Sequence, residues 1–216
     1  MKSKMRAIVI GILCVCLFAV VACHRESATK EGNATGPLAA SGTPLEGITK
    51  AFQAQLALKS YRIKMETTTP QTGTQIRTAE YVAPDRFHWK GEKDEMIVVG
   101  SASYMRMGDK WIKSPIDAAA MVNSVRDPKF LDQLSKGANV TLVGPDVVDG
   151  TPALVYQYTL NNAFGANMQS TSKTWVRASD GMPLKVESSG EFNGMKTTTL
   201  ATYYDFNADI KIEPPM

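Results

Sequence analysis

Few side chains in this sequence could do covalent or metal chemistry. Its 216 residues include three cysteines and two histidines. Protein metal sites are usually built from clustered His, Cys and carboxylate ligands. However, Cys14 and Cys16 lie in an apolar run near the N-terminus, and His24 lies in the polar stretch that follows it. This leaves His88 as the only histidine of the long C-terminal part, where we expect no metal, no cofactor and no thiol chemistry.

The remaining reactive groups are carboxylates, and they form no catalytic pattern. Several stand among predicted turns and helix ends: Asp94, Glu95, Asp127 and Asp132. Acidic residues at such positions commonly serve solubility and capping. The sequence contains no G-x-S-x-G elbow, no Walker loop and no dinucleotide fingerprint. His88 alternates with Phe87 and Trp89, which is typical of an exposed strand histidine. We therefore predict a protein that is not an enzyme and has no catalytic residues.

The N-terminus has the layout of a signal peptide. Lys2, Lys4 and Arg6 precede an apolar run of 16 residues, 7–22. A spanning helix needs about 20 apolar residues, so the length favours a removable signal, with an uncleaved anchor as the alternative. Loss of the three basic residues would leave 21 basic against 21 acidic residues. A neutral chain without a basic cluster is not expected to bind nucleic acid.

The end of the apolar run, Val20-Val21-Ala22-Cys23, resembles a bacterial lipobox. In proteins with this motif the cysteine receives a diacylglycerol and becomes the new N-terminus. The resemblance implies that Cys23 is a lipid anchor and that the chain's partner is an envelope membrane, since two or more acyl chains anchor a protein stably. An ordinary small residue in a plain signal peptide is the alternative. By analogy, His24 in place of an aspartate favours the periplasmic face of the outer membrane in a Gram-negative host.

The rest of the chain divides into a tether and one domain. Residues 23–45 hold the proposed lipidated cysteine and a stretch rich in Ser, Thr, Gly, Ala and Pro, typical of a flexible tether. Residues 46–216 are long enough for one domain with a core. The domain begins with a helical pattern, because Ile48, Phe52 and Leu56 recur at four-residue steps. We expect this helix to end near Ser60.

From Tyr61 the hydrophobic period changes to two, which predicts strands. Similar segments follow at 75–83, 86–90, 95–99, 103–107, 140–143, 153–160, 173–177, 184–188, 196–206 and 210–212. Turn residues such as Asp149-Gly150 and Asp180-Gly181 separate them and favour hairpins. We therefore predict a mainly β fold with helices, a strongly curved antiparallel sheet or barrel of about 10–11 strands. Two helical pieces, at 116–125 and 130–135, interrupt it and form either a connection over one end of the core or a lid.

Several motifs resemble the LolA/LolB-like lipoprotein carriers and their mycobacterial lipoprotein relatives. The resemblance covers nearly all of residues 46–216, and its motifs lie at 81–89, 95–100, 175–184, 204–206 and 212–215. It implies an unclosed β-barrel, covered by an N-terminal helix and a helical lid insertion, whose concave apolar face shelters acyl chains. One position departs from the family: the periplasmic carrier has an arginine before the proline that corresponds to Pro84, and this chain has Ala83.

The resemblance also implies a ligand site. If the family register holds, one wall of an apolar cavity consists of Ile63, Met65, Phe87, Trp89, Met96 and Val98. The helical insertion would supply the other wall through Met121 and Val125. The expected function is an envelope lipoprotein that binds the acyl chains of a lipid or lipoprotein for transport or sorting. The alternative is an envelope module with the same fold that binds a peptide or protein, or acts as a sensor.

Overall fold

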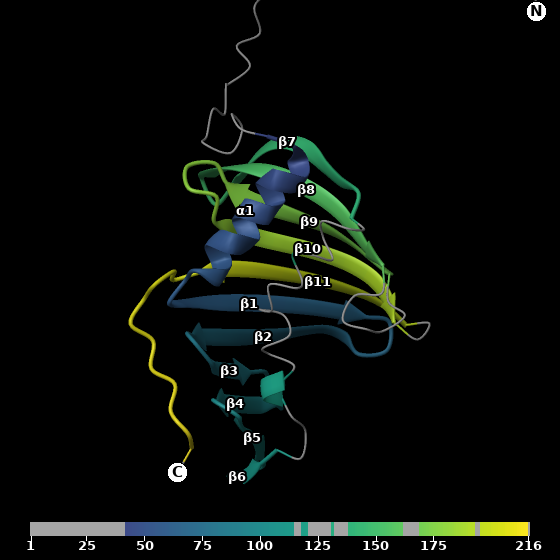
Figure 1. Cartoon of the computed structure of the whole chain (residues 1–216). Coiled ribbons are helices and arrows are strands. Elements are labelled where there is room, and N and C mark those ends of the chain that lie inside the picture. Colours follow the sequence, from purple (N-terminus) through teal and green to yellow (C-terminus); the bar gives the residue numbers. More distant parts are fainter. Residues whose placement is uncertain are drawn as a thin grey trace, which may run out of the picture. The chain divides into compact units, whose positions relative to one another are not determined.

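The computed structural model describes residues 42–114, 118–120, 131, 138–161, 169–192 and 195–215. All of them belong to the second of two compact units in the chain, Ala34–Met216. They contain helix α1 (Pro44–Leu56), a short helical segment at 118–120 and one antiparallel sheet of 11 strands (Figure 1). The predicted mainly β architecture with an unclosed sheet is confirmed. Within the described part of the chain, no helix is long and apolar enough to cross a membrane.

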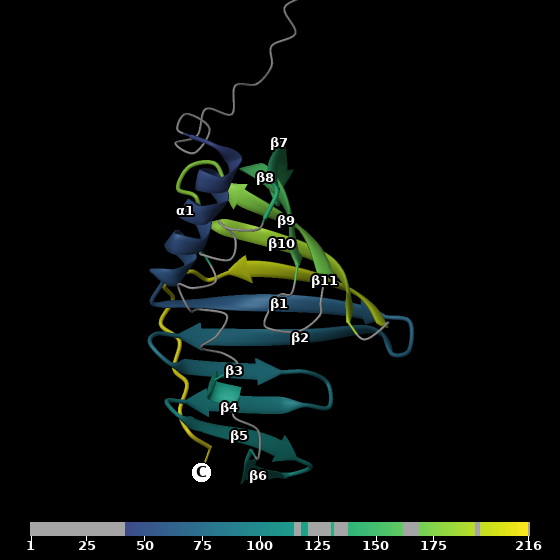
Figure 2. The same ribbon diagram turned by 45° about the vertical axis from the view of Figure 1, so that its right-hand side comes forward.

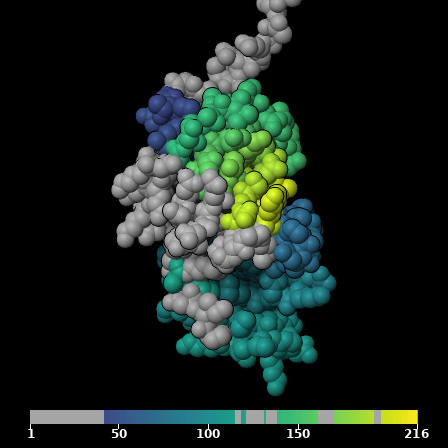
Figure 3. Space-filling view, turned by 90° about the vertical axis from the view of Figure 1, so that its right-hand side faces the viewer, coloured from purple at the N-terminus to yellow at the C-terminus, as the bar shows by residue number. Residues whose placement is uncertain are grey.

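The sheet places the first and last strands side by side and leaves two open edges. Across it the order is β6-β5-β4-β3-β2-β1-β11-β10-β9-β8-β7. Figure 3 shows this order by colour, with blue β1 and β2 next to yellow β11. The strands are β1 (Ser60–Thr69), β2 (Gly73–Val82), β3 (Arg86–Lys90), β4 (Glu95–Val99), β5 (Ala102–Met107), β6 (Lys110–Lys113), β7 (Val140–Val148), β8 (Thr151–Asn161), β9 (Gln169–Arg177), β10 (Pro183–Phe192) and β11 (Met195–Tyr204).

The strand register divides the side chains between two faces. Tyr156 of β8 packs against Ile48 of α1, and residues directly opposite in neighbouring strands share a face. From Tyr156 the row runs through the following residues: Thr174, Val186, Ala201, Met65 and Arg77. We call this side the helix-side face and the other the opposite face. Figure 2 shows α1 and the short teal segment on the same side of the sheet.

Helix α1 begins at a complete capping box. The Thr43 side chain accepts a hydrogen bond from the Glu46 backbone N–H, and the Glu46 carboxylate accepts one from Thr43. Pro44 occupies the first turn, where a missing N–H does no harm. On the buried side, Gly47 brings the helix close to the sheet, because a Cβ there would lie 2.5 Å from the Tyr156 hydroxyl. The helix contacts β7, β9 and β10.

The short helical segment at 118–120 covers a different part of the same face. Ala118 and Ala119 are buried against Val98 of β4, with Phe87 and Met96 packed around them. Val98 and Phe87 are opposite each other in register. Part of the predicted helical insertion therefore packs on the helix-side face. Leu131 packs against a second group of buried side chains, which we call the α1 cluster: Ile48, Ala51, Leu154, Tyr156, Tyr158 and Val176. The remainder of the predicted helices lies outside the described residues.

Two predictions about strands are wrong. The segment Ile210 to Ile212 is not a strand, although both side chains are buried. Asp205 and Asn207 have positive φ values of 52° and 59°, so the chain turns away from the sheet after β11. It then passes the strand ends, where Arg86 Nη1 donates to the Ile212 carbonyl. Conversely, β6 was not predicted, because its four residues are too short for a periodic signal.

Candidate functional site

The candidate site is the helix-side face of β1 to β5. Its first row joins adjacent strands in register and consists of Ile63, Ala79, Trp89, Met96 and Met105. A second row runs beside it and consists of Tyr61, Tyr81, Phe87, Val98 and Ser103. The structure thus brings six predicted residues from β1, β3 and β4 to one face of the sheet: Ile63, Met65, Phe87, Trp89, Met96 and Val98. Met121 and Val125, the predicted second wall, lie outside the described residues.

Burial changes across this face. Val98 is 1% exposed, because Ala118 and Ala119 cover it. By contrast, Ile63, Met65 and Trp89 remain half-buried. Alanine side chains are short, so the segment that carries them can approach the sheet closely. The second row is therefore mostly buried, at Tyr61, Tyr81, Val98 and Ser103, whereas most of the first row is only half-buried.

Trp89 is held in place by polar neighbours at the margin of the site. Its indole N–H donates to Asp94 Oδ2 at 3.2 Å. The same oxygen accepts from Arg77 Nε at 3.1 Å, and the Arg77 guanidinium lies 5.4 Å from the Trp89 ring centroid. Cations at such distances are attracted to the face of an indole ring. The one arginine in this part of the helix-side face is thus neutralised by Asp94 and positions the tryptophan.

A tyrosine cluster joins the second row of the candidate site to β11. Tyr61 contacts both Tyr81 and Tyr203, with ring centroids 5.1 Å and 6.0 Å apart. The Tyr81 hydroxyl donates to the Pro84 carbonyl at 2.8 Å. Burial, reinforced by the neighbouring phenol of Tyr61, raises the pKa of the Tyr203 hydroxyl. The Tyr203 phenol therefore stays neutral, and the cluster contributes packing and hydrogen bonds.

Ser103, at the end of the second row, has an unusual environment. It is 4% exposed, and its Oγ has no hydrogen-bond partner among the residues that the structure describes. Its carbonyl oxygen accepts from the Ser114 N–H at 2.8 Å, which fixes the backbone on either side of β6. Nothing in the sequence marks this serine, because only the register shows that it shares a face with Val98.

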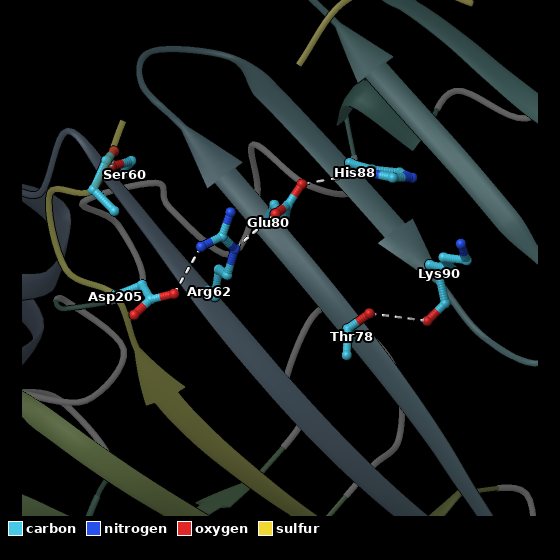
Figure 4. Close-up of polar contacts among 8 residues, drawn as sticks. Ser60, Arg62, Thr78, Glu80, His88, Lys90 and Asp205 are labelled. Carbon is cyan, nitrogen blue, oxygen red and sulfur yellow. Dashed lines mark hydrogen bonds and ion pairs between the residues drawn. The ribbon is translucent and has the colours of Figure 1, made fainter. Parts of the chain in front are cut away.

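The opposite face of the same strands carries a ladder of charged side chains, which sequence reasoning missed. Arg62 Nη1 lies 2.7 Å from Asp205 Oδ2, and its Nε lies 2.7 Å from Glu80 Oε1 (Figure 4). Hydrogen bonds to these two carboxylates raise the pKa of the Arg62 guanidinium. His88 continues the ladder, because its Nδ1 lies 3.5 Å from Glu80 Oε2. A shallow cavity of about 220 Å³ lies between these side chains and Tyr204.

The ladder ends at Glu95 on β4. His88 Nε2 lies 2.9 Å from Glu95 Oε1, and Arg106 Nη1 lies 3.0 Å from Oε2. Burial acts to raise the pKa of the Glu95 carboxyl, but the hydrogen bonds from His88 and Arg106 outweigh it and lower the pKa. His88 is thus not a solvated strand histidine but a bridge between two glutamates. Each carboxylate of the ladder has a basic partner, which is the arrangement of a structural ion-pair network.

Metal binding finds no support among the described residues. No group of three or more His, Cys, Asp or Glu side chains in that part of the chain is placed to hold a metal ion. The helix-side face of β1 to β5 is mostly apolar, and among the described residues its one buried side-chain oxygen without a hydrogen-bond partner is Ser103 Oγ.

Comparison with known proteins identifies the fold. No protein-family model matches the sequence, and no curated protein matches it. The lipoprotein LppX of Mycobacterium tuberculosis matches in structure with a TM-score of 0.56 and 13% sequence identity, over 79% of this chain and 98% of LppX. LprF of Mycobacterium bovis matches with a TM-score of 0.54 and 12% identity, over 80% of this chain and 96% of LprF. The predicted resemblance is confirmed at the level of structure: this chain has the fold of the lipoproteins LppX and LprF.

Proposed function

We propose that this chain is a lipid-anchored protein of the bacterial cell envelope that binds acyl chains of a lipid or lipoprotein on the helix-side face of β1 to β5. Residues 1–22 would be the signal peptide, residues 23–45 the acylated Cys23 and its tether, and residues 46–216 the carrier domain. The periplasmic face of the outer membrane is the favoured site in a Gram-negative host. Transport or sorting of the bound molecule would be the role.

One observation supports acyl-chain binding most directly. Three strands, β1, β3 and β4, place six apolar side chains on one face, and all of these except Val98 stay half-buried. Each acyl methylene moved from water onto such a surface contributes about 0.8 kcal/mol. A chain of ten methylenes would therefore gain about 8 kcal/mol before the costs of ordering. The flexible side chains of Met65 and Met96 can repack around guests of irregular shape.

A pair of variants on β4 tests the location of the site. Met96 and Ile97 are adjacent and both half-buried, but they point to opposite faces. We expect Met96→Lys to reduce lipid recovered by organic extraction of the purified full-length protein at least tenfold, because an ammonium on the apolar face is poorly solvated. Ile97→Lys is the matched control and should retain the lipid.

The outcome has a clear contrary case. Circular dichroism and thermal melting should show both variants folded. If wild-type protein carries no lipid and displaces no hydrophobic dye, the acyl-binding proposal fails. If the two variants lose lipid equally while folded, binding does not take place on the helix-side face.

The anchor is tested separately at Cys23. We expect wild-type protein to partition into the detergent phase and Cys23→Ala to lose the attached acyl groups, with a change in mass that mass spectrometry measures. A Cys23→Ala protein that still partitions as wild type would argue for a retained apolar N-terminus. Fractionation of the wild-type protein to the inner membrane would contradict the outer-membrane assignment.

A peptide-binding module is the second candidate, and the edge strand β7 favours it. Leu142, Val143 and Val147 are 46%, 58% and 61% exposed, and an open edge can accept an added strand. Pro145 and the register shift at 142–144 limit the pairing surface. A partner that co-purifies with lipid-free protein, and is lost when Val143 is replaced by proline, would favour this function over lipid carriage.

A further inference from the structure

The described residues include four buried polar side chains, and three of them are satisfied. Ser60 Oγ donates to the Ala208 carbonyl, the hydroxyls of Ser172 and Ser188 lie 2.8 Å apart, and Thr174 pairs with Tyr158 at 3.3 Å. The fourth, Ser103, has no partner for its Oγ. Buried hydroxyls in native proteins are nearly always hydrogen-bonded, because an unpaired one forfeits its bonds to water. The exception therefore requires an explanation.

The position of Ser103 suggests one. It lies directly opposite Val98 on the helix-side face, and Val98 is covered by Ala118 and Ala119. The hydroxyl is thus in an enclosed part of the candidate acyl site. Its backbone is fixed by the hydrogen bond from Ser114 to its carbonyl, so the side chain cannot be drawn out to solvent by a small shift of β5.

The side chains near Ser103 indicate which kind of ligand group could accept a hydrogen bond from its hydroxyl. The hydrophobic side chains packed around Val98 are those of Phe87, Met96, Ala118 and Ala119. None of them could neutralise an anion, and an unpaired charge in apolar surroundings is costly. A serine hydroxyl can donate one hydrogen bond, which matches a neutral carbonyl oxygen. An ester carbonyl next to a hydrocarbon chain combines the acceptor with an apolar body.

We propose that Ser103 is the polar anchor of the ligand site and donates a hydrogen bond to the carbonyl oxygen of an ester-linked acyl chain. The ligand class is therefore a neutral acyl ester, such as an acylglycerol or the diacylglycerol group of another lipoprotein, and not a free fatty acid. This inference rests on the proposed acyl-binding function and adds the chemistry of its ligand.

The test compares an ester with a hydrocarbon of similar length. Full-length protein in a bile-salt detergent is loaded with a hydrophobic dye, which methyl palmitate or octadecane then displaces. The ratio of the two affinities is compared between variants, so that competition by detergent cancels. We expect Ser103→Ala to lower the affinity for methyl palmitate about fivefold, as for one neutral hydrogen bond, and to leave octadecane unchanged.

A second readout separates this role from a structural one. Ser103→Ala removes an unsatisfied hydroxyl, so the ligand-free variant should melt at or above the wild-type temperature. Ser172→Ala is the matched control, because it removes a buried, paired hydroxyl on the same face. It should lower the melting temperature and leave the ratio of ester to hydrocarbon affinity unchanged.

The possible failures are distinguishable. If wild-type protein binds neither methyl palmitate nor octadecane, the acyl-binding function is refuted and the role of Ser103 with it. If it binds both and Ser103→Ala leaves the affinity ratio unchanged, Ser103 is not the ester anchor while the carrier function stands. Equal or tighter binding of palmitate anion than of its methyl ester would overturn the preference for a neutral ligand.

Discussion

The two halves of the sheet present the same face to very different surroundings. Under α1, side chains from the helix and from β8 and β9 are almost fully excluded from water: Ile48, Ala51, Tyr156 and Val176 are 0 to 2% exposed. In β1 to β3, Ile63, Met65 and Trp89 on that face remain half-buried. A surface sealed by a helix stabilises the fold and is closed to a guest. The contrast indicates that the half under α1 contributes most of the buried packing, whereas the other half keeps more of its apolar side chains accessible.

In β1 to β4, where fewer side chains on the helix-side face are fully buried, ion pairs stabilise the opposite face of the sheet. There the ladder from Asp205 through Arg62, Glu80 and His88 to Glu95 links β1, β2, β3 and β4. Exposed ion pairs each contribute at most about 1 kcal/mol, but this chain of pairs fixes neighbouring strands without occupying the helix-side face. Its contribution depends on pH, unlike that of the α1 cluster.

The largest expected effect comes from breaking the sealed half. Ile48→Ala removes a side chain that is 0% exposed, and such truncations cost about 2–5 kcal/mol. We expect urea unfolding to show a loss of that size, while any protein that remains folded keeps its affinity for acyl probes. Loss of lipid binding in a folded Ile48→Ala protein would mean that the two halves are not independent.

A smaller loss is expected where the helix approaches the sheet. Gly47→Ala places a Cβ 2.5 Å from the Tyr156 hydroxyl and 2.8 Å from its ring carbon Cζ, and overpacking typically costs about 1–3 kcal/mol. Tyr156→Phe removes the nearer atom. A double-mutant cycle by urea denaturation should therefore give a combined loss smaller than the sum of the two single losses. Additive losses would show that the close approach is not the cause.

The smallest expected effect is on the free energy of unfolding at acidic pH, through Glu95 of β4. The folded pKa of Glu95 is lowered, so its contribution is present above its ordinary pKa of 4.5 and is lost as the pH falls through the folded value. We expect the free energy of unfolding to lose about 1 kcal/mol less between pH 6 and pH 3 in Glu95→Gln than in wild type. Arg106→Gln should reduce the same loss in part. Hydrogen exchange at low pH should show β3 and β4 opening before β8 and β9.

Much of the sheet could be predicted because the alternation of side chains reports directly on the two faces. The strands at 86–90 and 95–99 were predicted with the bounds that the structure shows. The expectation that Ile63, Phe87 and Met96 share a face came from the family resemblance. What alternation cannot supply is which strands are neighbours. Sequence analysis therefore missed the ladder, whose residues Arg62, His88 and Glu95 meet only in the correct strand order.

Sequence patterns also gave wrong or incomplete predictions where burial depends on contacts between distant parts of the chain. Ile210 and Ile212 read as a strand because apolar residues alternate, yet their burial comes from packing across strand ends. Trp175 shows the same limit: it sits on the opposite face, where its indole donates to Asp146 and Lys185 lies over its ring. Ser103 carries no sequence signal at all, because an unsatisfied hydroxyl is defined only by its surroundings.

The pairing of β1 with β11 has a consequence for how this chain folds. Arg62 and Tyr204 are opposite each other in this pair of strands. The first of the 11 strands to be synthesised can therefore complete its pairing only after the last one has been synthesised. Loops of such length close at an entropic cost, and folds dominated by distant pairings form slowly. Until β11 arrives, the edge of β1 is free to pair with another chain. A chain that lacks its last strand would therefore be expected to aggregate. A chaperone that binds the incomplete sheet would have to cover the unpaired edge of the N-terminal hairpin β1–β2.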